Sequence, residues 1–308
     1  MRLFREKSQK ETILCKLKKL IEKNTRKIRP IVGIIMALSG MLLLLGIIVG
    51  YCTLFALVIT ISAYMRHRAK KTPVTKALLF MFAFILIAVT ASLVTVFFEF
   101  PPLYNDEVVG DLLKVSDPVE IMLTLTNTFF YQLAVIFTLL GFYCWVAFAR
   151  LVFFGGEDKR RPIIKLVKIV VFIAIVIQLL VYVLLLYLII GFTSGVPLDR
   201  DLLLLSASTL PLVVAIIQLA LYLCIMLPTL IRAIQVQHRL SIDDPHRSNF
   251  LYLGVMAFFF LLMMGFNLLD MVLLVLGEDY PTLAFIVFWL IVSAALYAGY
   301  RGFFSTKS

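Results

Sequence analysis

Residues 77–98 read ALLFMFAFILIAVTASLVTVFF, and this stretch decides the fold class. A membrane-spanning helix needs about 20 consecutive apolar residues, and this run supplies them without a charged side chain. A closed β-barrel also satisfies the backbone polar groups in lipid, but its strands alternate polar and apolar residues. The run does not alternate, so it predicts a transmembrane α-helix.

Six further blocks of the same kind flank this run. Together the blocks predict spans near residues 41–65, 77–98, 119–150, 163–193, 202–232, 249–277 and 281–302. The chain is 62% apolar and 15% charged, against roughly 45–50% and about 25% in soluble domains. We therefore predict an all-α integral membrane protein, a bundle of about seven transmembrane helices with short loops. This membrane domain covers residues 31–304, and a short tail, 305–308, follows it.

The loops alternate in charge along the chain. The loops after the first, third and fifth spans, together with the C-terminus, hold sixteen Lys and Arg and four acidic residues. The other loops hold ten acidic residues and two basic ones. Because basic loops stay on the cytoplasmic side, this pattern predicts a cytoplasmic C-terminus in a multi-pass protein of the cell membrane.

Residues 1–30 form a basic amphipathic segment, with apolar residues at helical spacing among eleven Lys and Arg. Seven crossings would place this segment outside, against the charge rule that orients the loops. Three interpretations stay open: the segment lies on anionic lipid headgroups at the inner surface, it covers the acidic outer mouth as a lid, or it does neither. A natural start at Met36 or Met41 is a further alternative.

Polar residues interrupt two of the predicted spans, on one helix face each. The third span carries Glu120, Thr124, Asn127, Thr128 and Tyr131 at spacings of three and four residues, and the sixth carries Asn267 and Asp270, one turn apart. Asn127 and Asp270 lie at similar depth from the predicted outer ends, so the two faces could meet. We predict that these residues form a ligand- or ion-binding site, although such residues also serve as hydrogen-bonding contacts between helices.

Asp270 is the residue on which this site depends most. A carboxylate inside hydrocarbon is costly unless it is paired, hydrated or protonated. No Lys or Arg occurs in the outer half of any predicted span. We therefore expect Asp270 to be neutral or to bind an external cation.

Catalytic motifs are absent from the sequence. It contains no His-Glu-x-x-His, no Gly-x-Ser-x-Gly and no Gly-x-x-x-x-Gly-Lys. The four cysteines and three histidines are scattered along the chain. We expect neither enzyme activity, nor a metal site or cofactor, nor a nucleic-acid partner.

Three function classes remain. The leading expectation is a receptor-like or sensory module that binds a small or cationic ligand in an outward-facing polar pocket and acts on a cytoplasmic signalling partner. The second class is a proton- or cation-coupled secondary transporter that uses Asp270. The third is a non-catalytic subunit of a membrane complex, for which the polar patch is a docking surface.

Overall fold

The computed structural model describes residues 42–96, 118–154, 161–197, 199–205, 210–241, 243–244, 246–275 and 282–304. The basic segment 1–30, the side chain of Glu120 and the tail 305–308 lie outside this described part. The contacts below concern the compact unit that begins at Leu45.

Seven long apolar helices make up most of the described residues, and each is long and apolar enough to cross a bilayer. They are Leu42–Ala69, α2 (Pro73–Val96), α4 (Pro118–Val152), α5 (Arg161–Thr193), α7 (Leu210–Arg239), α8 (Arg247–Val275) and α9 (Leu283–Phe304), and α6 (Arg200–Leu204) is a short additional helix. No strand occurs among these residues. The predicted all-α fold is confirmed, with seven long apolar helices that could cross a membrane.

Near the predicted fifth span, residues 202–232, the structure describes the short helix α6 (Arg200–Leu204) and, from Leu210, the long helix α7. Residues 206–209 lie outside the described part. Asp199 caps α6, because its carboxylate accepts hydrogen bonds from the backbone N–H groups of Asp201 and Leu202.

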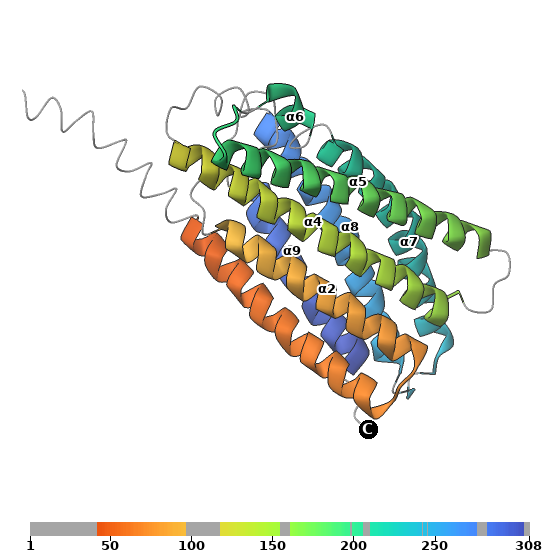
Figure 1. The fold of residues 1–308 in the computed structure, drawn as a ribbon. Helices are drawn as coiled ribbons and strands as arrows, with labels where there is room; N and C mark the ends of the chain where they lie inside the picture. The colour runs from red at the N-terminus through yellow and green to blue at the C-terminus, as the bar shows by residue number, and fades with distance from the viewer. Residues whose placement is uncertain are drawn as a thin grey trace, which may run out of the picture. The chain divides into compact units, whose positions relative to one another are not determined.

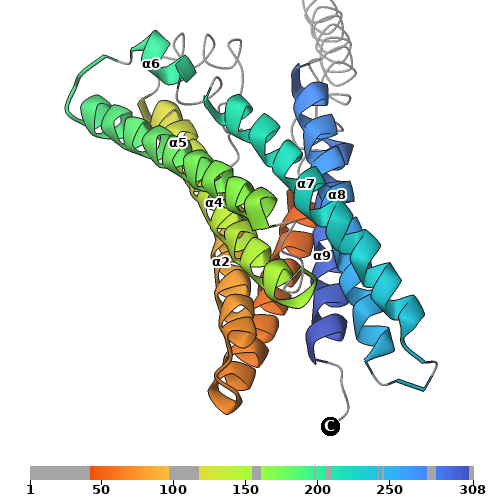
Figure 2. The same ribbon diagram turned by 90° about the vertical axis from the view of Figure 1, so that its right-hand side faces the viewer.

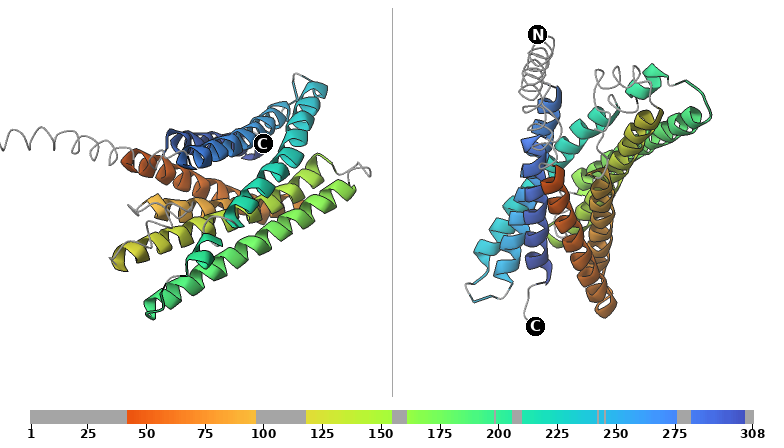
Figure 3. Two further views of the ribbon diagram at one scale, coloured as in Figure 1. Left: turned by 90° about the horizontal axis from the view of Figure 1, so that it is seen from above. Right: turned by 90° about the vertical axis from the view of Figure 1, so that its left-hand side faces the viewer.

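The helices follow one another around the bundle in chain order, as Figure 1 and Figure 2 show. Each of α2, α4, α5, α7, α8 and α9 packs against the next in this series. The helix Leu42–Ala69 lies between α2 and α9 (Figure 3, right). Its Thr60 Oγ1 donates to the Phe82 carbonyl of α2 at 3.1 Å, and Cys52 Sγ lies 2.8 Å from Ser293 Oγ of α9. The seven helices therefore surround a common interior.

Small residues on α9 allow it to approach α8 closely. A Cβ atom added to Gly302 would lie 3.1 Å from the Leu253 side chain and 3.3 Å from the Asn249 carbonyl oxygen. The neighbouring Phe303 packs edge-on against Phe82 of α2 and Phe148 of α4, with ring centroids 5.7 and 5.1 Å apart. One end of α9 is thus joined to three other helices.

The outward surface of the bundle is apolar over long distances. On α5, large side chains at helical spacing are exposed, namely Ile169, Phe172, Val176, Leu180 and Val183. Soluble proteins rarely expose so continuous an apolar strip to water. Together with the lengths of the helices, this surface fits a polytopic membrane protein.

Candidate ligand-binding site

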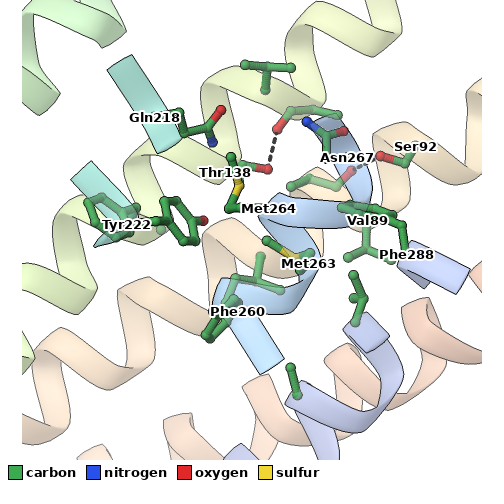
Figure 4. Close-up of a pocket in the computed structure, with 18 of the residues that line it drawn as sticks. Val89, Ser92, Thr138, Gln218, Tyr222, Phe260, Met263, Met264, Asn267 and Phe288 are labelled. Atoms are coloured by element: carbon green, nitrogen blue, oxygen red, sulfur yellow. Dashed lines mark hydrogen bonds between the residues drawn. The ribbon is translucent and has the colours of Figure 1, made fainter. Parts of the chain in front are cut away.

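A cavity of about 160 Å³ lies between the helices (Figure 4). Its lining comes from α2, α4, α5, α7, α8 and α9, and most of it is aliphatic, aromatic or methionine. Met263 and Met264 of α8 lie in its wall, beside Phe260 of the same helix and Phe288 of α9. An engineered apolar cavity of about 150 Å³ in another protein binds benzene, so this volume suits a small molecule.

Two glutamines from neighbouring helices meet in the cavity wall. Gln178 Nε2 of α5 donates a hydrogen bond to Gln132 Oε1 of α4, and both side chains are 0% exposed. This bond leaves Gln132 Nε2 and Gln178 Oε1 without a hydrogen-bond partner among the described residues. Exchanging the oxygen and nitrogen of both amides would leave the same kinds of group free. The pair therefore keeps one buried donor and one buried acceptor without a partner, whichever way the amides are oriented.

Both tryptophans of the chain also line the cavity. They are Trp145 of α4 and Trp289 of α9, and both are buried. Within the part of the chain that the structure describes, neither indole N–H has a hydrogen-bond partner. An indole can only donate, and a buried donor without a partner costs about 1–3 kcal/mol.

Aromatic contacts connect three helices at the cavity. The rings of Phe142 on α4 and Tyr222 on α7 are stacked, with centroids 4.5 Å apart and an interplanar angle of 14°. Phe260 of α8 lies against both Tyr222 and Trp145, at centroid distances of 6.3 and 6.1 Å. All four residues belong to the lining, so this part of the wall is aromatic and stiff.

Asp270 is 5% exposed and lies one turn beyond Asn267, which lines the cavity. Thr282, directly before α9, donates its Oγ1 hydrogen to Asp270 Oδ1 across 2.5 Å. Thr282 Oγ1 also accepts a hydrogen bond from the backbone N–H of Phe285 at 3.2 Å, so Thr282 is the N-cap of α9. The Asp270 carboxyl group is thus paired with the hydroxyl group of the residue that precedes α9, and not with a basic side chain.

Two of the predicted site residues, Tyr131 and Asn267, line the cavity. Tyr131 also lies close enough to Asp270 for an electrostatic interaction between α4 and α8. The predicted residues Thr124, Asn127 and Thr128 are buried in α4, one to two turns nearer its N-terminus, outside the cavity lining. The Thr128 hydroxyl donates to the Thr124 carbonyl of its own helix at 2.9 Å.

Comparison with models of known protein families, with curated proteins and with solved structures found no match.

Several residues of this site were not predicted from the sequence. Gln132, Gln178 and Gln218 each interrupt an apolar block, and all three line the cavity. A primary amide inside a transmembrane segment needs a partner, which makes its position informative. The two tryptophans gave no comparable signal, because aromatic residues are common in any span.

Proposed function

We propose that the protein is a receptor-like module of the cell membrane that binds a small ligand in the cavity between its helices. The cavity carries this proposal, because six helices line it and the polar side chains of Gln218 and Asn267 belong to its largely apolar wall. Pockets between the helices of a bundle are common ligand sites. A ligand there contacts six helices together, so its binding free energy can favour one arrangement of the bundle over another.

Basic side chains at the opposite end from Asp270 are the proposed output surface. Arg66 lies over the Phe304 ring of α9 at 6.0 Å, and Arg301 of α9 lies over the Tyr252 ring of α8 at 5.3 Å. The charge pattern supports a cytoplasmic position for this end. A shift of α9 would move both contacts, and a cytoplasmic signalling partner would detect the changed surface.

One observation favours a second candidate, a proton- or cation-coupled transporter. Asp270 is buried in a helix that could cross the membrane, and acids in that position often mark ion or proton paths. However, α8 is one continuous helix from Arg247 to Val275, whereas transporter sites are commonly built from broken helices. Proton uptake by proteoliposomes under an imposed potential, compared with Asp270→Asn, separates the candidates. Uptake that the substitution abolishes would favour the transporter.

The proposed binding can be tested with bromobenzene, whose bromine quenches nearby tryptophan fluorescence. Both tryptophans line the cavity, so quenching in nanodiscs reports directly on it. Ala215 lines the cavity, while the neighbouring Ile216 is exposed on the outer surface. We expect saturable quenching in the wild type and in Ile216→Phe, and its loss in Ala215→Phe, which fills the cavity. Equal quenching in all three proteins would contradict the proposal.

A further inference from the structure

We propose that Arg150 of α4 and Lys168 of α5 bind the phosphate group of an anionic phospholipid at the cytoplasmic end of the bundle. This headgroup site is separate from the cavity, whose lining contains neither residue. Three observations carry the inference. The two cations lie close together between neighbouring helices, no acid pairs with them in the described structure, and the side chains around them are exposed on the outer surface of the bundle.

The first observation is the geometry of the two side chains. The helices α4 and α5 lie side by side (Figure 1), with Arg150 in the last turn of α4. Lys168 lies about 10 Å along α5 from its first residue, Arg161. Its Nζ is 5.3 Å from the ring centroid of Tyr143 of α4, and Lys168 is close enough to Arg150 for an electrostatic interaction. Because Tyr143 and Arg150 are two turns apart on one face of α4, this face and Lys168 form one basic site.

The second observation concerns charge. Within the part of the chain that the structure describes, neither Arg150 nor Lys168 has an ion pair or a side-chain hydrogen bond. The acids Glu157 and Asp158, between α4 and α5 in the sequence, lie outside that part. Both cations belong to helices that could cross the membrane, where a charged side chain is costly unless it reaches water or a partner. The two like charges also repel each other, so a bound anion stabilises both.

The third observation indicates that the anion belongs to a lipid. Tyr143 is exposed, and so are Leu166, Ile169 and Phe172, which surround Lys168 in the sequence of α5. A phosphate group bound beside these side chains can bring acyl chains into contact with their apolar surface. The charge pattern of the loops supports a cytoplasmic position for this end, and the cytoplasmic leaflet contains anionic lipids. A free phosphate ion would leave the apolar surface beside the site unused.

The two side chains suit a phosphate group in different ways. The guanidinium group of Arg150 can donate two parallel hydrogen bonds to phosphate oxygens, whereas the ammonium group of Lys168 adds a compact positive charge. Basic sites between transmembrane helices on the cytoplasmic side are known to bind lipid headgroups. An anionic phospholipid therefore satisfies both the charge of this site and the apolar surface around it.

Native mass spectrometry of the detergent-solubilised protein tests the proposal, because it counts bound lipids. Phosphatidylglycerol and phosphatidylcholine with identical acyl chains are titrated separately, so only the headgroup differs. We expect the wild type to bind phosphatidylglycerol more tightly. Arg150→Gln/Lys168→Gln should lower its affinity for phosphatidylglycerol about fivefold for each charge removed, the effect of one basic side chain at an anionic membrane surface. Its affinity for phosphatidylcholine should not change.

A matched control removes a lysine from another helix. Lys76 of α2 also lies over an aromatic ring, that of Phe80 in its own helix, with Nζ 6.0 Å from the ring centroid. Lys76→Gln should keep the preference for phosphatidylglycerol. Arg150→Lys/Lys168→Arg, which retains both charges, should keep most of it. A loss in Lys76→Gln as large as in the double glutamine variant would show that general surface charge holds the lipid, which would overturn the inference.

Two further outcomes would also overturn it. Equal affinity of the wild type for the two lipids would mean that Arg150 and Lys168 only extend toward the headgroup region, and this comparison needs no variant. Inorganic phosphate and glycerol 3-phosphate carry the anion without acyl chains, and neither should displace phosphatidylglycerol when added in excess. Displacement by either would assign the site to a free anion and not to a lipid.

Discussion

Thr282 and Asp270 connect the beginning of α9 to α8 through a hydrogen bond of 2.5 Å. Because Thr282 also caps α9, one hydroxyl group both satisfies a buried carboxyl group and fixes the first turn of a helix that lines the cavity. We expect this contact to matter for stability.

Thr282→Val should destabilise the protein by about 1–2 kcal/mol, because it removes both the donor to Asp270 and the cap of α9. The matched control is Thr126→Val, whose hydroxyl bonds only to the Met122 carbonyl of its own helix at 2.7 Å. Thermal unfolding in detergent measures both. The loss should be smaller when Thr282→Val is combined with Asp270→Leu, which removes the acceptor, and equal losses in the two backgrounds would show that the pair is not coupled.

Single and double substitutions in the buried glutamine pair should have different effects on stability. Gln132→Leu leaves the Gln178 amide buried without the hydrogen bond that the two share, so we expect a loss of about 1–3 kcal/mol. Gln132→Leu/Gln178→Leu removes both polar groups and should recover most of that loss. The free energies of unfolding of the two single variants and the double variant, measured in one detergent, give the coupling free energy of the pair. Additive losses would mean that the amides do not act as a pair.

The fold was predictable from the sequence because lipid imposes a simple condition. In lipid, any apolar run such as residues 77–98 must pair its backbone N–H and C=O groups with one another. The length of the run alone therefore indicates a helix. The short helix α6 (Arg200–Leu204) was not predictable in this way, since its apolar residues run into the block that predicts the fifth span.

The site was predictable only in part, for a different reason. Helical spacing shows which residues share a face, as for Asn267 and Asp270, but not which face of another helix lies opposite. Tyr131 reaches the cavity while Asn127 lies a turn away from its lining, and the pairing of Gln132 with Gln178 depends on how α4 and α5 pack.

Close packing of α8 and α9 predicts different effects for two glycines. Gly302→Ala places a methyl group 3.3 Å from the Asn249 carbonyl oxygen and 3.1 Å from Leu253, so we expect a loss of about 1–3 kcal/mol from overpacking. At Gly265 no atom lies within 4 Å of the added Cβ, and Gly265→Ala should stabilise α8 by up to about 1 kcal/mol. Melting temperatures should therefore shift in opposite directions. A shift of the same sign at both glycines would count against the close α8–α9 contact.

The proposed orientation predicts the accessibility of the C-terminus. In a variant with all four native cysteines replaced by serine, Ser308→Cys should react with a membrane-impermeant maleimide only after intact cells are permeabilised. Asp199→Cys, at the other end of the bundle, is the control and should react in intact cells. Labelling of Ser308→Cys before permeabilisation would reverse the orientation and place the basic surface outside.

The measurement that tests the central claim most directly is anomalous X-ray diffraction from crystals of the protein soaked with bromobenzene. The account predicts a bromine peak inside the bundle, within contact distance of the tryptophan and glutamine side chains that line the cavity. A well-diffracting crystal with bromine peaks only on the outer apolar surface, and with side chains filling the interior, would contradict the account.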